Sequence, residues 1–544
     1  MSRRGRRLSR IAGLPPADND DVTVERDLKV EMPDGAILLA DRWLSPSVPH
    51  APVVLVRTPY GRATLGGLWR VFARRGYQVV VQSCRGTFGS GGEWEPFFHE
   101  RADGKATLEW LVAQPWCVGP VGMFGPSYMG LTQWAVADEP PPQLAALALQ
   151  VTAARVRDSV IFPGGSFCLE TGAAWLHQLE FQERGPRRLL LAIATSRRRM
   201  RPAFAALPLA DADTLTLGRR IACYQDWLVH DRPDDPWWDP IDFSGDVGKV
   251  PPASMVGGWY DIFLPAQVGD FAKLRDAGRQ VRLTIGPWTH ASPRGGAAGL
   301  RDTLDWFGFQ LRGRSSPDLW EGVRLFVMGS RRWVHLDTWP PPSTLQRWHL
   351  HAGGSLAVGG PASGSPDSYR YDPADPTPGV GGPSLDVFTA GRRNQRRRER
   401  RADVLTYTSD VLSSPVTVAG PIRAEIWVRA SQPHTDVFLR LCDVDRRGRS
   451  RNLSDGILRL EPSEGSVPSD GVRRVEVSMW PTANTFRVGH RIRLQVSSGA
   501  HPLFARNPGS GEPLGGATTL VASDQEVFHD PDHPSAIVLP VSDL

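Results

Sequence analysis

The feature that most constrains the fold is an alternation of short apolar runs and helical segments in the first 151 residues. The runs are rich in β-branched residues, as in strands that are buried on both faces of a parallel sheet. The segments between them place apolar residues at helical spacing. Repeated strand–helix–strand units of this kind predict a doubly wound α/β domain. The predicted strands are 53–57, 78–82, 121–125 and 144–151, and the predicted helices are 68–75, 102–112 and 128–136.

The rest of the chain divides into three further parts by the same signals. Strand runs disappear after residue 151, and helical spacing predominates at 170–184, 189–200 and 215–230. Strands return at 254–257 and 281–286, so the helical part is expected to be an insertion in the α/β domain. The expected domains are an α/β core at 20–151 and 250–335, a helical cap at 152–249 and a β domain at 336–544.

The last part has the pattern of an antiparallel β domain. Short segments of alternating apolar and polar residues are separated by turns that contain Gly, Pro and Asp. This spacing predicts a sandwich or a jelly roll. The clearest predicted strands are 423–430, 437–443, 473–479 and 490–498.

Composition restricts the class of protein. Of the 544 residues, 41% are hydrophobic and 22% are charged, which is typical of a globular chain rather than a disordered one. The sequence contains no apolar stretch long enough to span a membrane. The basic start, from Arg3 to Arg10, is not followed by the apolar region of a signal peptide. We therefore expect a cytoplasmic protein with no membrane partner.

The basic residues and the cysteines bear on two further classes of function, nucleic-acid binding and metal binding, and both are disfavoured. Seven arginines lie between Arg392 and Arg401, which is one signal of nucleic-acid binding. Only four of the 63 basic residues in the chain are lysine, which indicates genome composition rather than selection for a polyanion. We interpret the run as a solvated, partly paired loop. The five cysteines lack the spacing of a zinc site or a disulfide framework, which fits a reducing compartment: Cys84, Cys117, Cys168, Cys223 and Cys442.

The sharpest local feature is the hexapeptide Gly125–Gly130, which lies between a predicted strand and a predicted helix. A serine on such a turn holds its hydroxyl clear of the sheet, and the next backbone N–H points to where an oxyanion would form. Ser127 is therefore the candidate nucleophile, and the N–H of Tyr128 is a candidate oxyanion donor. The second glycine comes three residues after the serine rather than two, and a turn without a catalytic role is the alternative.

Two later predicted strands end in residues that complete this chemistry. Asp261 follows the strand at 254–257, and His290 follows the strand at 281–286. The order Ser, Asp, His at the ends of successive strands is that of the α/β-hydrolase triad. The alternatives are a helix N-cap for Asp261 and a packed loop histidine for His290.

A second oxyanion donor is expected at the turn that ends the strand at 53–57. Tyr60 lies in this turn between Pro59 and Gly61, where its hydroxyl can reach the site. The alternative is that the Tyr60 ring only packs. The loss of one such donor typically lowers kcat by about 10²–10³.

These motifs, together with several others, carry a family resemblance from about residue 22 to the C-terminus. The motifs are RTPYG at 57–61, RGTFGSGGEW at 85–94, QPW at 114–116, GPSYMG at 125–130, GWYD at 258–261, GPWTH at 286–290, YDPADPTP at 371–378 and DVLTYTSDVL at 403–412. As a set they resemble the CocE/NonD hydrolases, which include cocaine esterase, α-amino-acid ester hydrolases, glutaryl cephalosporin acylases and the catalytic part of X-Pro dipeptidyl-peptidases. The resemblance implies an α/β-hydrolase core, a helical cap and a C-terminal jelly roll.

The resemblance also implies a role for each candidate residue. Ser127 would be the nucleophile, His290 the general base and Asp261 the residue that orients it, with the Tyr60 hydroxyl and the Tyr128 N–H as the oxyanion hole. No metal or organic cofactor is implied.

The expected substrate is an ester with an apolar acyl group. Family members that act on α-amino esters hold the substrate ammonium with carboxylates, whereas apolar Phe263 and Leu264 follow Asp261 in this chain. Some of the tryptophans in the cap and the catalytic loops are expected to line the acyl pocket: Trp175, Trp227, Trp237, Trp238, Trp259 and Trp288.

Four other functions remain open at this stage. An amidase, a β-lactam acylase of the glutaryl-cephalosporin type and an X-Pro dipeptidyl-peptidase-like enzyme use the same triad. A non-catalytic carbohydrate-binding protein is a more remote alternative. The expected partner is a small ester or amide and not a nucleic acid, and homo-oligomerisation stays open.

Overall fold

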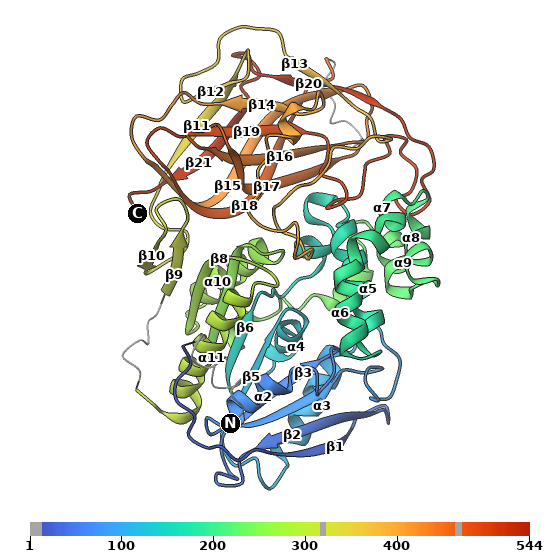
Figure 1. Cartoon of the computed structure of the whole chain (residues 1–544), viewed down its shortest axis with the longest axis vertical. Helices are drawn as coiled ribbons and strands as arrows, with labels where there is room; N and C mark the ends of the chain where they lie inside the picture. The colour runs from blue at the N-terminus through green and yellow to red at the C-terminus, as the bar shows by residue number, and fades with distance from the viewer. Residues whose placement is uncertain (1–12, 316–321, 463–469) are drawn as a thin grey trace.

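The computed structural model describes residues 13–315, 322–462 and 470–544. Within these residues the chain forms two large sheets, which lie one above the other in Figure 1, and a group of helices beside them. The basic start at Arg3 to Arg10, for which the sequence predicts no signal peptide, lies outside the described residues.

The first sheet is parallel from β4 to β9, with antiparallel strands at its two edges. Strands β3 and β4 are buried at every position, which explains why their sequences are apolar runs without alternation. Across the sheet the order is β1 (Thr23–Glu31), β2 (Ile37–Leu44), β4 (Gln78–Ser83), β3 (Val53–Thr58), β5 (Val121–Pro126), β6 (Leu144–Gln150), β7 (Ala253–Tyr260), β8 (Val281–Thr289), β9 (Gly322–Val327) and β10 (Arg332–Leu336).

Helices cover both faces of this sheet. Alternate residues of β3 belong to different cores: Val53 and Leu55 to one face, Val54 and Val56 to the other. The first face packs against α3 (Glu100–Val112), α4 (Tyr128–Ala137) and α10 (Leu264–Asp276), and the second against α2 (Gly66–Ala73) and α11 (Pro293–Arg312). The predicted α/β class is confirmed.

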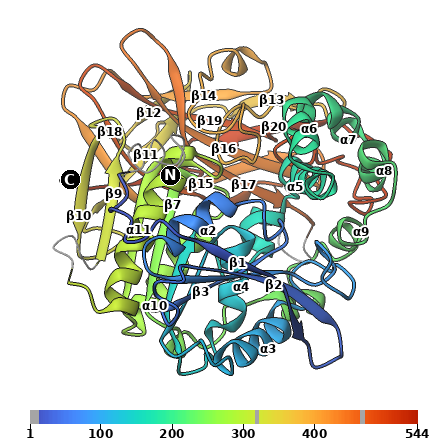
Figure 2. The ribbon, with the colours of Figure 1, turned by 60° about the horizontal axis from the view of Figure 1, so that its bottom comes forward.

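The helical insertion lies between β6 and β7 in the sequence, and its helices stand together beside the first sheet (Figure 1, Figure 2). The single helix predicted at 215–230 is wrong. The chain breaks at Gly218, whose left-handed φ of 76° ends one helix before the next begins. The helices are α5 (Leu169–Gln182), α6 (Pro186–Arg199), α7 (Arg201–Ala205), α8 (Ala212–Leu217) and α9 (Ala222–Val229).

The second sheet forms the β-rich C-terminal domain. It closes on itself, because β21 pairs with both β11 and β15. A jelly-roll path for its strands stays a prediction. Across the sheet the order is β13 (Asp367–Tyr371), β20 (Ser523–Phe528), β15 (Val416–Ala430), β18 (Arg473–Phe486), β17 (Ser450–Leu460), β16 (Thr435–Val444), β19 (Arg491–Ser497), β14 (Leu405–Thr408), β12 (Ser355–Ala357), β11 (Thr344–His351) and β21 (Ala536–Val541).

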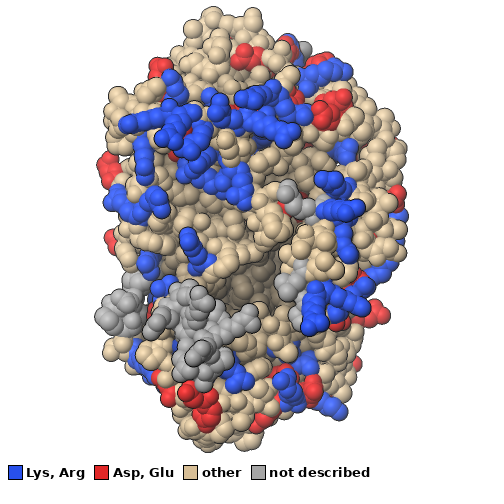
Figure 3. All heavy atoms as spheres, in the orientation of Figure 1, with Lys and Arg blue, Asp and Glu red and all other residues tan. Residues whose placement is uncertain are grey.

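The arginine run of the β-rich domain is only partly a solvated loop. Arg392 is partly exposed and pairs with the buried carboxylate of Asp443 at 2.8 Å. Arg398, in contrast, is buried and donates to Gln495 at 3.0 Å and Ser497 at 2.9 Å. On the face seen in Figure 3, Lys and Arg side chains gather over the β-rich domain. Part of the run therefore serves the fold of this domain.

Three further observations concern the described residues. No helix among them is both long and apolar enough to cross a membrane. No three His, Cys, Asp or Glu side chains in the described ranges gather so that they could hold a metal ion. All five cysteines are free thiols, and four of them are buried.

Candidate active site

Ser127 lies on a sharp turn between β5 and α4. Its backbone has φ 58° and ψ −124°, a left-handed conformation that side-chain-bearing residues rarely adopt. The turn is held in place because the Ser127 N–H donates to the Gln150 carbonyl at 2.9 Å and the Ser127 carbonyl accepts from the Gly130 N–H at 2.8 Å. This is the strand–turn–helix geometry that presents a nucleophilic serine at the edge of a sheet.

The two glycines of the motif are needed for space. A Cβ on Gly125 would lie 2.3 Å from the Met129 Cβ, and one on Gly130 would lie 2.4 Å from the Thr152 side chain. Both distances are far below van der Waals contact. The position of the second glycine, three residues after the serine, therefore follows from how closely α4 approaches Thr152, in the segment that follows β6.

Asp261 and His290 meet at the same edge of the sheet. Asp261 follows β7 directly and His290 follows β8, and the carboxyl ends of these parallel strands lie side by side. His290 Nδ1 lies 2.8 Å from Asp261 Oδ2, and the carboxylate is fully buried. The other carboxylate oxygen accepts from the Phe263 N–H at 2.8 Å, immediately before α10. Asp261 thus caps this turn and holds the imidazole at once.

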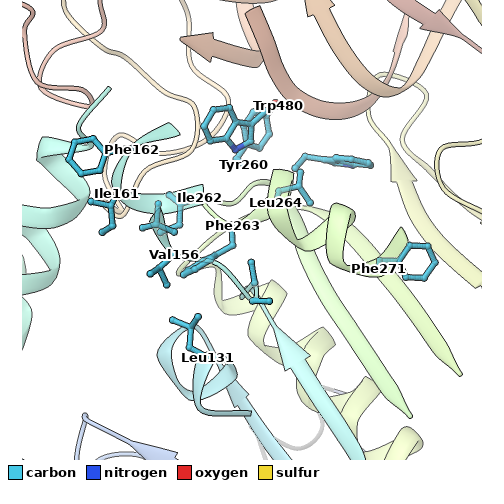
Figure 4. Packing of buried hydrophobic residues seen from close by; sticks show 14 of the residues in the cluster. Leu131, Val156, Ile161, Phe162, Tyr260, Ile262, Phe263, Leu264, Phe271 and Trp480 are labelled. Carbon is cyan, nitrogen blue, oxygen red and sulfur yellow. The ribbon is translucent and has the colours of Figure 1, made fainter. Parts of the chain in front are cut away.

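The β-rich domain also contacts this pair. Trp480, on β18, donates its indole N–H to the backbone carbonyl of Asp261 at 3.1 Å. Figure 4 shows Trp480 at the boundary between the β-rich domain and the loop that carries Ile262 and Phe263. Nothing in the sequence signals this contact, because the two residues lie in different predicted domains.

The Tyr60 hydroxyl reaches the nucleophile. Tyr60 lies just after β3, and its side chain interacts with that of Ser127. The same oxygen accepts from the indole N–H of Trp175, on α5, at 3.2 Å. Burial raises the pKa of the Tyr60 phenol to about 12, so it remains a protonated hydrogen-bond donor at neutral pH.

Tyr128 is the first residue of α4, and hydrogen bonds of its side chain hold it in place. Its phenol donates to Glu100 Oε1 at 2.8 Å and accepts from the Phe97 N–H at 2.9 Å. The other oxygen of Glu100 pairs with buried Arg57 at 2.7 Å. Amide groups at the start of a helix have no partner within the helix, so the N–H of Tyr128 is available to an anion.

A cavity of about 530 Å³ joins these residues. Ser127, His290 and both tyrosines line it, and most of its other walls are apolar. Of the tryptophans considered from the sequence, Trp175 and Trp227 line the cavity, and the other four do not. Its apolar walls include Leu131, Val156, Val160, Ile161, Ile262, Phe263, Leu385 and Val387.

One wall of the cavity comes from the β-rich domain. The loop at 385–387 lines the cavity, and Asp386 is the one carboxylate among the described lining residues. The loop is tied to the insertion because Glu170 Oε1, on α5, accepts from Ser384 Oγ at 2.6 Å and from the Asp386 N–H at 3.1 Å. The sequence carries no motif for this wall.

The fold defines the chain as an α/β-hydrolase with a β-rich C-terminal domain. Residues 34–292 match the X-Pro dipeptidyl-peptidase (S15) family, and residues 318–538 match the C-terminal non-catalytic domain of X-Pro dipeptidyl-peptidases. Cocaine esterase from Rhodococcus sp. (strain MB1 Bresler) is 33% identical over 583 aligned positions, which cover 95% of this chain and 98% of that one. The chain belongs to this family of serine ester hydrolases and peptidases, and it resembles the CocE/NonD ester hydrolases within it.

Solved structures agree on the fold. An α-amino-acid ester hydrolase superposes with a TM-score of 0.81 at 22% identity, over 98% of this chain and 99% of that one. An aminopeptidase from a marine sediment Thaumarchaeota archaeon superposes with a TM-score of 0.79, also at 22% identity, over 97% of this chain and 98% of that one. At this identity the likeness concerns the fold alone.

Proposed function

We propose that the chain hydrolyses carboxylic esters through an acyl-enzyme on Ser127, with His290 as general base and Asp261 as the residue that orients it. The observation that carries the proposal is the 2.8 Å contact between His290 and buried Asp261, beside a cavity that Ser127 also lines. A serine, a base and a buried carboxylate in this relation can activate the serine hydroxyl for attack on a carbonyl.

The reaction proceeds in two steps. Ser127 Oγ attacks the ester carbonyl while His290 accepts its proton, and Asp261 stabilises the imidazolium. The tetrahedral oxyanion is stabilised by the Tyr60 hydroxyl and the Tyr128 N–H. When the intermediate collapses, the alkoxide leaves with the proton from His290. Water, activated by His290, then hydrolyses the acyl-enzyme to the acid and restores Ser127.

The substrate we propose is an ester with an apolar acyl group. Phe263 lines the cavity and lies 5.7 Å from His290 between ring centroids, whereas Leu264 is fully buried outside the cavity. Burial of a hydrocarbon acyl group against an apolar wall is favourable. The same wall offers no partner for the ammonium group of an α-amino substrate, so burial of that charge is unfavourable. We place this activity in the cytoplasm, and the free cysteines support a reducing compartment.

A second candidate is hydrolysis of an X-Pro peptide. Asp386 favours it, because a carboxylate in the cavity wall is a suitable partner for a peptide ammonium. Matched substrates separate the two candidates: an aryl acyl ester, the corresponding amide and an X-Pro anilide. Faster turnover of the ester by several orders of magnitude supports the first candidate, and preference for the anilide supports the second.

A fluorophosphonate probe tests the proposed nucleophile directly. We expect the probe to label wild-type protein at Ser127, as located by peptide mass mapping, and not to label the Ser127→Ala variant. An absence of labelling in folded wild-type protein would contradict the acyl-enzyme mechanism, and a non-catalytic binding protein would then be the better interpretation.

A further inference from the structure

Trp175 connects the helical insertion to the proposed oxyanion hole. It lies on α5, and its indole N–H donates to the Tyr60 hydroxyl oxygen at 3.2 Å. An indole nitrogen can only donate a hydrogen bond. The phenol oxygen is therefore the acceptor in this contact.

This contact restricts where the phenol hydrogen can point. A phenol has one hydrogen, and since its oxygen accepts from Trp175, that hydrogen must be donated in another direction. The other side chain that interacts with the Tyr60 hydroxyl is that of Ser127, the residue on which the tetrahedral intermediate would form. Trp175 therefore disfavours the orientation in which the Tyr60 hydrogen points toward α5 and away from Ser127.

The indole itself is held on several sides. Its ring stacks on those of Phe97, Tyr128 and Trp227. The distances between ring centroids are 5.8, 6.1 and 6.1 Å, and the interplanar angles are 10°, 20° and 22°, respectively. Phe97 and Tyr128 come from the α/β core, whereas Trp227 comes from α9 of the insertion. A donor that is fixed in this way needs little reorganisation when charge develops, which is the condition for an effective oxyanion hole.

We propose that Trp175 is a positioning residue for catalysis, which orients the Tyr60 hydroxyl toward the oxyanion, in addition to forming a wall of the cavity. This inference rests on the proposed function, because it requires Tyr60 to stabilise an oxyanion on the Ser127 adduct. The two roles of Trp175 predict different kinetics. A wall acts on KM in proportion to acyl size, whereas a positioning residue acts on kcat for every acyl group.

The test is a double-mutant cycle of Trp175→Phe and Tyr60→Phe, measured with an acetyl ester and a bulky aryl acyl ester. Phenylalanine retains an aromatic ring for stacking but removes the N–H donor. We expect Tyr60→Phe to lower kcat by about 10²–10³, and Trp175→Phe to lower kcat by about tenfold for both esters. In the Tyr60→Phe background, Trp175→Phe should have little further effect on kcat, because its target hydroxyl is already absent.

A second variant and a second ligand guard against simple misfolding. Trp175→Tyr retains a donor on an aromatic ring, and we expect it to keep more of kcat than Trp175→Phe. An aryl boronic acid, which forms a tetrahedral adduct with an active-site serine, should bind Trp175→Phe about tenfold more weakly than wild type. Near-UV circular dichroism verifies that each variant is folded.

Three results would overturn the inference: additive losses of kcat in the cycle, an effect on KM alone that grows with acyl size, or no effect on kcat. A normal kcat for Tyr60→Phe would instead remove the oxyanion role of Tyr60, while fluorophosphonate labelling at Ser127 would still stand. Failure of the inference and failure of the proposed function can therefore be distinguished.

Discussion

Each half of the candidate site receives an indole N–H from a different part of the chain. In the half around Ser127, Trp175 of the helical insertion donates to a side-chain hydroxyl, that of Tyr60. In the half formed by Asp261 and His290, Trp480 of the β-rich domain donates to a backbone carbonyl, that of Asp261. A hydroxyl can rotate, whereas a backbone carbonyl moves only with its loop. The first contact therefore selects the direction of a proton, and the second fixes the position of a loop.

The two halves also differ in how much of their geometry is local. The strained turn at Ser127 is held by its own neighbours in the sequence and by the adjacent strand β6. The loop after β7 is fixed partly by another domain, because Tyr260 donates to the Asn452 carbonyl at 3.2 Å in addition to the Trp480 contact. The β-rich domain is thus expected to support the acid–base half more than the nucleophile half.

The largest expected effect is that of Asp261→Asn. An amide cannot stabilise the imidazolium, and it favours the wrong tautomer of His290, so kcat should fall by about 10⁴. Steady-state kinetics with an aryl acyl ester measures the loss. Asp276→Asn, at the exposed far end of α10, is the matched control and should retain wild-type kcat. A loss below tenfold for Asp261→Asn would contradict the orienting role of this carboxylate.

A smaller loss is expected for Trp480→Phe, which removes the indole N–H and keeps an aromatic ring. We expect kcat to fall by about 3–10-fold, because one buried hydrogen bond to the Asp261 loop is lost. Unlike Trp175→Phe, this change should be additive with Tyr60→Phe, since it acts on the other half of the site.

The control for Trp480→Phe is Trp427→Phe, another tryptophan of the β-rich domain, whose ring contacts His533 at 5.1 Å. It should leave kcat at the wild-type value. Equal losses of kcat for the two variants would indicate a general effect of destabilising this domain. Non-additive effects of Trp480→Phe and Tyr60→Phe on kcat would show that the two halves of the site do not act independently.

Glu170→Gln should act on the cavity wall rather than on the reaction. The buried carboxylate of Glu170 holds the loop at 384–386, and a neutral amide accepts these hydrogen bonds less strongly. We expect KM for bulky acyl esters to rise by about threefold, with a smaller change for acetyl esters. A change in kcat that is equal for all esters would show that Glu170 acts on the triad instead.

The smallest effect on activity is expected for Asp270→Asn, which should change the pH dependence of stability alone. Asp270 lies on α10, where its carboxylate accepts from the Ala154 N–H at 2.8 Å, and burial raises its pKa to about 7. The folded protein holds this proton more tightly than the unfolded chain does. The contribution of the protonated carboxyl to the free energy of unfolding is therefore complete below about pH 4, and it is lost as the pH rises to about 7.

The variant should therefore be more stable than wild type at pH 8, by roughly 2–4 kcal/mol, and close to it at pH 4. Urea unfolding at the two pH values measures this difference. A gap between variant and wild type that is the same at both pH values would show that Asp270 does not titrate between them.

The α/β core was largely predictable from the sequence, and the β-rich domain was less so. The predicted strands at 53–57 and 78–82 each differ by one residue from β3 and β4, because fully buried strands give uninterrupted apolar runs. In the β-rich domain the prediction missed β17 (Ser450–Leu460). Its buried positions include Asn452, Ser454 and Asp455, which carry no apolar signal. Asp455 accepts from Arg440 on β16, Ser454 donates to the Trp480 carbonyl on β18, and Asn452 bonds to the loop at 391–393. A local sequence pattern cannot show such distant partners.

The sequence alone determined the strand–turn–helix context of Ser127 and the order in which Asp261 and His290 follow it. These depend on short-range propensity and on the rule that parallel strands end at one edge of a sheet. Only the tertiary structure decided that Trp175 and Trp480 donate to the two halves, and that the loop at 385–387 forms a wall of the cavity. The reason is physical: these contacts join segments from different domains, and whether they meet depends on how the domains pack, which no local spacing of residues encodes.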